Sequence, residues 1–314
     1  MENKTKLPQI LVLIGPTAIG KTALSLDLAQ RFNCEIISVD SMQVYRYMDI
    51  GTAKASTAER DQVPHHLIDI VDPDEHYDAA RFTKDATQLI NEITARGKLP
   101  LLTGGTGLYL KSLLEGIFPE APSDKEVRNT LKERLNRDGA NVLHEELSLC
   151  DRISANKIHV NDTQRLLRAL EVYHTTGIPW SLHLAKQNKN QPSGLPVDVL
   201  QIGLTCDREK LYQRINMRCD MMIDGGLEVE VQNLLAKGFS SKLKSMGSIG
   251  YRHMLGYINN QFDKEEMVRL LARDTRRYAK RQYTWFNKIK EVNWVDVTQQ
   301  KIVMDMVEQW RKNL

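Results

Sequence analysis

A glycine-rich turn near the start of the chain, set between an apolar run and a helical pattern, restricts the fold to a few topologies. Residues 15–22 read Gly-Pro-Thr-Ala-Ile-Gly-Lys-Thr and match the motif G-x-x-x-x-G-K-[ST] in full. The apolar run at residues 10–14 is typical of a strand buried on both faces of a parallel sheet. Leu24, Leu28 and Phe32 follow with helical spacing. These three segments predict a phosphate-binding loop at a strand–helix junction.

The alternation of strand and helix continues along the chain. Further strands are predicted at residues 35–39, 99–103, 197–204 and 292–297. Helices are predicted at residues 22–32, 81–96 and 301–310, with one long helix or two abutting helices at 263–290. Alternating elements of this kind form βαβ units with right-handed crossovers. The predicted fold class is therefore α/β, a P-loop NTPase-like parallel sheet flanked by helices.

The pattern changes between about residue 123 and residue 176, where amphipathic helix dominates. Asp124 and Asp162 are suited to cap helices there. Residues 187–194 are polar and contain Pro192 and Gly194, which favours a linker. We predict an all-helical domain at residues 120–195, inserted into a catalytic core made of residues 1–119 and 196–314. A chain of 314 residues is long enough for about two domains.

The composition excludes some classes of protein and leaves others open. No apolar run approaches the roughly 20 residues that a membrane span needs, and the polar first residues do not resemble a signal peptide. The 4 cysteines have no CxxC spacing, which favours free thiols in a reducing cytoplasm over zinc or disulfides. A net charge of only +3 does not by itself require a nucleic-acid partner.

The glycine-rich turn predicts phosphate chemistry without specifying the compound. Its N–H groups and the N-terminus of the following helix favour an anion, and Lys21 adds a mobile charge. The hydroxyl of Thr22 suits Mg²⁺, which is the predicted cofactor. The candidate phosphate-binding residues are Gly15, Pro16, Thr17, Ala18, Ile19, Gly20, Lys21 and Thr22. The sequence has no NKxD guanine motif, and no apolar strand ends in the Asp-Glu pair expected of an ATPase.

Asp40 is the next candidate because it directly follows the second predicted strand. Ligands of open α/β sheets bind at the carboxyl ends of the strands, where this side chain would lie. Asp40 is therefore a candidate general base or Mg²⁺ partner. Capping of the following turn is the alternative.

Several motifs, in order along nearly the whole chain, resemble the tRNA dimethylallyltransferase family. They include the phosphate-binding motif, Asp-Ser-Met-Gln-Val-Tyr at residues 40–45, Gly-Thr-Ala-Lys at 51–54, Gly-Gly-Thr-Gly-Leu-Tyr at 104–109, Gln-Arg-Leu-Leu-Arg at 164–168 and the basic tail at 273–285. The first motif is generic, whereas the others together are specific. Without a Cys/His zinc-finger extension, the chain is more similar to the bacterial branch.

The resemblance implies transfer of a dimethylallyl group from dimethylallyl diphosphate to N6 of the adenosine 3′ of the tRNA anticodon. It implies that Asp40 accepts the N6 proton and that Thr17 and Arg218 assist at the diphosphate. It also implies a monomer with no obligate protein partner. The positions that match tRNA contacts of the family are Asp40, Ser41, Met42, Gln43, Thr106, Arg128, Gln164, Arg165, Leu166, Leu167 and Arg168. One departure is Asn287, where the family pattern has an arginine that Lys288 or Lys290 could replace.

The basic tail is a candidate RNA surface in its own right. Residues 275–290 contain no acidic side chain, and aromatic residues are interleaved with the cations. The alternative is a solvated basic face whose aromatic residues belong to the core. The glycine-hinged turn before Arg252 is a further candidate, with a plain connecting loop as its alternative. The candidate tRNA contacts in this part of the chain are Arg252, Lys280, Arg281, Gln282 and Trp285.

Weaker candidates and rival functions complete the interpretation. His65 and His66 favour a structural role over a metal site, and Met221 and Met222 favour packing over a prenyl pocket. A small-molecule P-loop kinase would turn over ATP and would not need the basic tail. An adenylate prenyltransferase would share the prenyl-transfer chemistry at the phosphate-binding motif but would lack the basic tail and the helical insertion. A pure RNA-binding module would leave the complete phosphate-binding motif unexplained.

Overall fold

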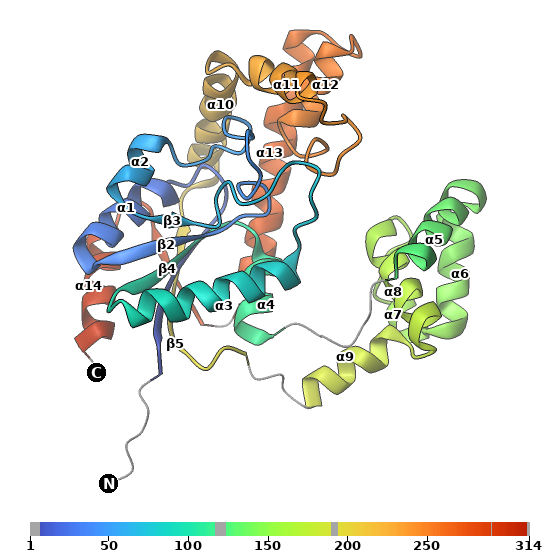
Figure 1. Cartoon of the computed structure of the whole chain (residues 1–314), viewed down its shortest axis with the longest axis horizontal. Coiled ribbons are helices and arrows are strands. Elements are labelled where there is room, and N and C mark those ends of the chain that lie inside the picture. The colour runs from blue at the N-terminus through green and yellow to red at the C-terminus, as the bar shows by residue number, and fades with distance from the viewer. Residues whose placement is uncertain (1–6, 117–123, 190–193, 290, 313–314) are drawn as a thin grey trace. The chain divides into compact units, whose positions relative to one another are not determined.

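The computed structural model describes residues 7–116, 124–189, 194–289 and 291–312 (Figure 1). The chain forms two compact units, one of Met1–Leu114 with Leu195–Leu314 and one of Glu115–Gly194. The first predicted domain boundary, at 119/120, lies outside the described residues, and the second, at 195/196, falls next to the division at Gly194.

The first unit is built on a parallel sheet, which confirms the predicted α/β fold class (Figure 1). Its strands are β1 (Gln9–Ile14), β2 (Cys34–Val39), β3 (His65–His66), β4 (Leu99–Gly104), β5 (Asp198–Thr205) and β6 (Val292–Asp296). They lie in the order β3-β2-β4-β1-β5-β6, and each neighbouring pair is parallel. Because β4 lies between β1 and β2, the phosphate-binding turn and Asp40 emerge from the same edge of the sheet, one strand apart.

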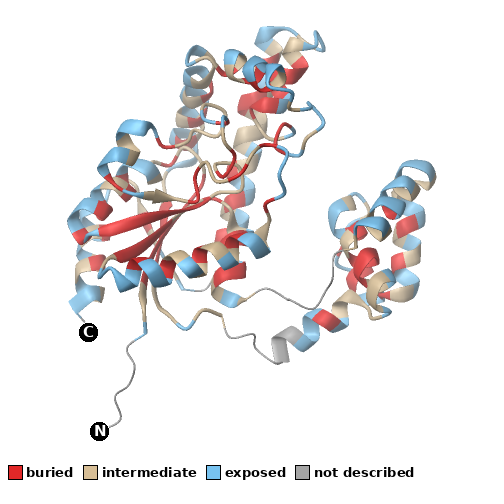
Figure 2. Cartoon of the chain, in the orientation of Figure 1, coloured by how far each residue is buried: buried red, intermediate tan, exposed pale blue. Residues whose placement is uncertain are grey.

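Helices cover both faces of this sheet because alternate side chains of each strand point to opposite faces. Ile10, Val12 and Ile14 pack in one core, whereas Leu11 and Leu13 pack in the other. Figure 2 shows the strands almost wholly buried and the helices buried on one side only. The helices of this unit are α1 (Lys21–Phe32), α2 (Thr57–Gln62), α3 (Ala79–Ala95), α4 (Gly107–Glu115), α10 (Arg208–Asp224), α11 (Leu227–Ala236), α12 (Tyr251–Ile258), α13 (Lys264–Phe286) and α14 (Gln300–Lys312).

The basic tail lies on one continuous helix of 23 residues, α13, rather than on two abutting helices. Its N-terminal part packs through Met267 and Leu271, and its C-terminal part through Ala279 and Phe286. Cations on the remaining faces are therefore held on a rigid element rather than on a loop.

The second unit is all-helical, with α5 (Lys125–Asp138), α6 (Ala140–Cys150), α7 (Arg152–Ala155), α8 (Thr163–Thr176) and α9 (Trp180–Lys189). The side chains of Asp124 and Asp162 accept backbone N–H bonds at the starts of α5 and α8, which confirms both predicted caps. Leu131, Leu143 and Leu170 are among the residues that form its own core. Within the part of the chain that the structure describes, no helix combines the length and apolar character needed to cross a bilayer.

Gly104 ends β4 where β4 and β2 come closest. A Cβ atom there would overlap the backbone carbonyl of Val39, which no side-chain rotation can relieve. We expect Gly104→Ala to lower the free energy of unfolding by about 1–3 kcal/mol, because the strands must separate. Denaturant unfolding measures this. Gly247→Ala is the control, because a Cβ atom there meets nothing closer than 3.4 Å. Equal stabilities of the two variants would contradict the packing argument.

Candidate active site

The glycine-rich turn connects β1 to α1 and has the backbone of an anion site. Gly15, Ala18 and Gly20 have φ angles of 153°, 63° and 106°. Alternation of left-handed with ordinary residues turns successive N–H groups to one side. The Nζ atom of Lys21 donates to the carbonyls of Gly15 and Pro16, both at 2.9 Å. The turn thus combines inward donors, a helix N-terminus and an ammonium group, which together suit phosphate.

The motif residues contribute to this site in different ways. Thr17, Ala18, Gly20, Lys21 and Thr22 line a cavity, whereas Gly15, Pro16 and Ile19 are buried beneath it.

Two of these buried residues differ in what they can offer a phosphate. Pro16 has no N–H to donate, and its carbonyl already accepts from Lys21. The side chain of Ile19 packs in the core between α1 and the sheet. Neither side chain can therefore bind phosphate, and Ile19 can contribute only through its backbone.

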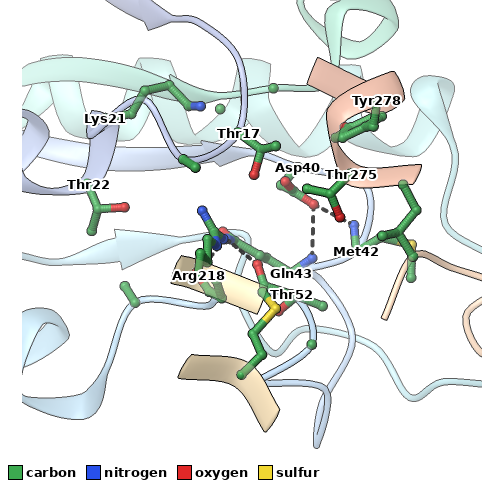
Figure 3. A pocket seen from close by; sticks show the side chains of 18 of the residues that line it. Thr17, Lys21, Thr22, Asp40, Met42, Gln43, Thr52, Arg218, Thr275 and Tyr278 are labelled. Atoms are coloured by element: carbon green, nitrogen blue, oxygen red, sulfur yellow. Dashed lines mark hydrogen bonds between the residues drawn. The ribbon is translucent and has the colours of Figure 1, made fainter. Parts of the chain in front are cut away.

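Asp40 lies directly after β2 and faces the same cavity (Figure 3). Its Oδ1 atom accepts the backbone N–H groups of Met42 at 2.8 Å and Gln43 at 3.3 Å. No described residue donates a hydrogen bond to Oδ2. Asp40 thus caps the turn with one oxygen and presents the other to the cavity. The capping alternative is therefore compatible with a chemical role.

The cavity has a volume of about 950 Å³ and a polar and an apolar side. The phosphate-binding turn, Asp40 and Arg218 form the polar side. The apolar side is lined by Ile50, Met217, Met221, Met222 and Ile249. The expectation that Met221 and Met222 serve packing is incomplete, because both side chains line this wall, and Met222 also packs against the core. A ligand with a charged end and a short apolar end fits both sides.

The charges in the cavity are strongly coupled. Burial lowers the pKa of Lys21 to about 7, the nearby Arg218 guanidinium lowers it too, and the Asp40 carboxylate opposes both. Burial also raises the pKa of Asp40, whereas the backbone N–H groups of Met42 and Gln43 and the cations Lys21 and Arg218 lower it. Burial lowers the pKa of Arg218, and Asp40 opposes this. These cations stabilise one carboxylate and retain a surplus of positive charge for an anionic ligand.

Gln282 ties the site together from α13. Its side-chain carbonyl accepts the backbone N–H of Thr17 at 2.8 Å, and its amide donates to the carbonyl of Gly105 at 3.0 Å. Gln282, a predicted tRNA contact, lines the cavity, but its side chain is only 5% exposed and both of its polar groups are bonded within the protein. Gly105 has no side chain because a Cβ atom would overlap this amide. Gln282 positions the phosphate-binding turn against β4.

The remaining predicted tRNA contacts of the first unit divide into two groups. Those that line the cavity beside Asp40 are Ser41, Met42, Gln43, Arg252 and Arg281. Those outside it are Thr106, Lys280 and Trp285.

Several of these side chains have defined partners within the protein. Thr106 Oγ1 accepts the backbone N–H of Ser41 at 3.1 Å, and Trp285 packs over Gly107. Arg252 is held by Asp274 at 2.7 Å. Arg281 lies over the ring of Tyr278, 5.8 Å from its centroid. Lys280 is exposed on the same helix.

The helical unit carries its own basic patch around a buried carboxylate. Glu171 is fully buried, and its Oε2 atom binds Arg128 at 2.6 Å and Arg168 at 3.2 Å. Gln164 and Arg165 are exposed on the same helix, α8. Two guanidinium groups held by one carboxylate leave net positive charge at the surface.

The prediction that Leu166 and Leu167 contact RNA does not hold for their side chains. Both are buried, with exposed fractions of 0% and 3%, in the core of the helical unit. Their spacing on α8 places them on the face opposite the exposed Gln164 and Arg165.

The weaker candidates have structural partners. His65 contacts the carbonyl of Val63, and His66 pairs with Glu35 at 2.7 Å. No group of three metal-ligating side chains exists among the described residues, and all four cysteines are free thiols.

Asn287 occupies the C-cap of α13, and the neighbouring Lys288 is exposed. Lys290, the other proposed substitute for the missing arginine, lies outside the described residues.

Sequence reasoning missed Arg214 and Thr275 and took Tyr278 only as one of the aromatic residues interleaved in the basic tail; all three line the cavity. Arg214 lies one helical turn before Arg218 on α10, and Tyr278 lies one turn before Gln282 on α13. Spacing of four residues on a helix was the available signal, because it places each on the face of a residue already singled out.

Fold and site define a P-loop α/β protein in which a phosphate-binding turn and a carboxylate share one cavity. The sequence matches the family model described as IPP transferase over residues 43–289 and that described as isopentenyl transferase over residues 8–71. It is 56% identical over 307 residues to the tRNA dimethylallyltransferase of Desulfotalea psychrophila, covering 98% of this chain and 96% of that protein.

Solved structures agree. The tRNA delta(2)-isopentenylpyrophosphate transferase of Staphylococcus epidermidis is 43% identical, with a TM-score of 0.71 and coverage of 98% of this chain and 100% of that one. A eukaryotic dimethylallyltransferase, solved in a crystallographic study of its action on tRNA, is 31% identical, with a TM-score of 0.78 and coverage of 93% and 75%. The chain therefore belongs to the IPP transferase family, as its motifs indicated.

Proposed function

We propose that the protein transfers a dimethylallyl group from dimethylallyl diphosphate to N6 of the adenosine 3′ of the tRNA anticodon, releasing diphosphate. The observation that carries this proposal is one cavity in which Lys21 and Arg218 face Asp40 beside an apolar wall. Membership of the IPP transferase family supports the substrate pair. A phosphate site with a carboxylate base beside it would also suit a kinase, so membership of the IPP transferase family favours prenyl transfer over phosphoryl transfer.

The residues of the cavity fit each part of the reaction. The N6 lone pair forms the new C–N bond with the allylic carbon while the bond from that carbon to the diphosphate oxygen breaks. Inward N–H groups, Lys21 and Arg218 stabilise the charge that develops on the departing diphosphate, and Thr17 lies beside them. The proton released from N6 passes to Asp40. The apolar wall around Met217 and Met221 receives the five-carbon chain.

A divalent cation fits the turn without a protein cage. The atoms near the diphosphate site that can ligate a metal ion are oxygen atoms. They include the hydroxyl of Thr22, which makes no hydrogen bond with the described residues. Mg²⁺ prefers a site with few protein ligands, where substrate oxygens and water complete its coordination. Thr22 would hold Mg²⁺, which supplies charge neutralisation on the diphosphate when bound.

Two basic surfaces are proposed for tRNA, each described within its own unit. One consists of Lys280, Arg281 and Trp285 on α13, where phosphate contacts and stacking are available together. The other consists of Arg128 and Arg168 around Glu171. The target adenine must leave its stack to enter the cavity, which an anticodon loop allows at low cost. We also place the protein in the cytoplasm, where tRNA is available, as a monomer without an obligate protein partner.

The rate should fall on the acid side at a higher pH than an ordinary aspartate would cause. Burial raises the pKa of Asp40 in the presence of Lys21, Arg218, Tyr109 and Tyr278, whose charges or hydroxyls face it. Only the carboxylate accepts a proton, so kcat is lost as the pH falls through this raised pKa. A kcat profile from about pH 4 to about pH 8 measures it. Loss of kcat only at or below the ordinary pKa of aspartate would contradict the assignment of Asp40 as the base.

Substrate competition tests the proposed function directly. The protein is incubated with labelled dimethylallyl diphosphate, Mg²⁺ and either tRNA, AMP or ATP. Label is expected in tRNA alone, at the adenosine 3′ of the anticodon when the product is digested and sequenced by mass spectrometry. Label in AMP or ATP would favour an adenylate prenyltransferase. ATP hydrolysis without prenyl transfer would favour a small-molecule kinase.

A further inference from the structure

Arg214 is an arginine of the cavity without a role in the reaction described above. It lies on α10 four residues before Arg218, and both side chains line the cavity. A Cβ atom at Gly20 would lie 3.2 Å from a terminal nitrogen of Arg214. The guanidinium group therefore lies against the last glycine of the phosphate-binding turn, next to the N-terminus of α1.

The Arg214 side chain also lacks a carboxylate partner in the described part of the chain. No acidic oxygen of the described residues lies within 4.0 Å of its guanidinium group. Arg252, another arginine that lines the cavity, is paired with Asp274 at 2.7 Å. A guanidinium group that lines the cavity beside a phosphate-binding turn, without a carboxylate partner among the described residues, is suited to a ligand anion.

Arg214 and Arg218 occupy different ends of the polar side of the cavity. The charge of Arg218 influences both Asp40 and Lys21, so it lies near the reacting centre. The guanidinium group of Arg214 lies instead beside Gly20, at the N-terminus of α1. One helical turn of about 5.4 Å separates the two residues along α10. Two guanidinium groups on the same face of α10, one near Asp40 and one beside Gly20, suit two linked phosphate groups.

We propose that Arg214 binds the terminal phosphate of the prenyl diphosphate, while Arg218 acts on the phosphate joined to the allylic carbon. This inference rests on the proposed function and assigns a specificity determinant within it. The terminal phosphate keeps its charge throughout bond breaking, whereas the inner phosphate gains charge on its leaving oxygen. Arg214 thus contributes to binding of substrate and product alike, and selects a diphosphate over a monophosphate.

Arg214→Gln should weaken diphosphate binding without an equal loss of turnover. We expect KM for dimethylallyl diphosphate and the Kd of inorganic diphosphate with Mg²⁺ to rise about 10- to 100-fold, with kcat within about 3-fold. The Kd of orthophosphate should change by less than about 3-fold, because the N–H groups of the turn and Lys21 can hold a single phosphate group without Arg214. Calorimetry with the two anions and steady-state kinetics with tRNA give these values. Arg214→Lys should restore part of the diphosphate affinity.

Arg208→Gln is the matched control. Arg208 is an exposed arginine of the same helix that stacks on Tyr212 and does not line the cavity. The Arg208→Gln variant should have Kd values for diphosphate and orthophosphate within about 2-fold of the wild-type values. Equal weakening of diphosphate and orthophosphate by Arg214→Gln, or no weakening of either, would overturn the inference, because a purely structural role would affect the whole turn. If the proposed function is wrong, the wild-type protein will bind diphosphate but leave tRNA unlabelled. This outcome is distinct from a failure of the inference about Arg214.

Discussion

Asp40→Asn is expected to lower kcat about 100- to 10,000-fold, the range that a general base typically contributes. Asparagine keeps an oxygen that can accept the N–H groups of Met42 and Gln43, so the turn after β2 should persist. It cannot take up a proton from N6. KM for dimethylallyl diphosphate should therefore change by less than about 3-fold. Single-turnover transfer of labelled prenyl groups to tRNA measures the chemical step directly.

Asp78→Asn provides the control for this result. Asp78 also accepts two backbone N–H groups, those of Ala80 and Arg81 at the start of α3, but it does not line the cavity. Asparagine is as good a cap as aspartate, so the rate should stay within about 2-fold. If both variants retained wild-type kcat, Asp40 would be a turn cap and the proton would have another acceptor.

Lys21→Met is expected to lower kcat/KM for dimethylallyl diphosphate about 100- to 1,000-fold, as loss of one preorganised donor to a developing anion does elsewhere. The ammonium group is fixed by the carbonyls of Gly15 and Pro16 and faces the cavity, so little reorganisation is needed when charge develops. Methionine fills a similar volume without the charge. Lys21→Arg should recover little, because a planar fork does not replace a point charge held by two carbonyls.

Lys301→Met removes one exposed lysine on α14 and serves as the control. It should leave kcat/KM within about 2-fold. Thermal unfolding of both variants shows whether the fold is preserved. A Lys21→Met enzyme with nearly wild-type kcat/KM would show that the diphosphate does not bind in the turn.

The order of strands and helices around the turn could be predicted because the strands are mainly apolar runs, although β2 includes Glu35 and Ser38 and β5 includes Gln201. The run at residues 10–14 and the helical spacing of Leu24 and Leu28 required a βαβ unit, and the caps at Asp124 and Asp162 followed from residue type. The two-residue strand β3 (His65–His66) has no such run, because at the edge of the sheet it pairs only with β2. A strand of that length leaves no periodic pattern to detect.

The candidate site was predictable where motif and position coincided, and less so where packing decides the role of a side chain. Gln282 lies in a basic segment, which suggested an RNA contact, yet the close approach of Gly105 draws its amide inward. Leu166 and Leu167 belong to a motif in which Gln164 and Arg165 are exposed, whereas the leucines form the core. The four-residue spacing of Arg214 and Arg218 was visible in the sequence, but only the tertiary structure places the Arg214 guanidinium beside Gly20.

The most direct test is a crystal structure of the protein with Mg²⁺ and a dimethylallyl diphosphate analogue whose bridging oxygen is replaced by sulfur. Both phosphate groups should lie in the turn of residues 15–22, with the allylic carbon directed at the Asp40 carboxylate and the methyl groups against Met217 and Met221. Phosphate groups bound elsewhere, or a prenyl chain directed away from Asp40, would contradict a shared cavity for leaving group and base.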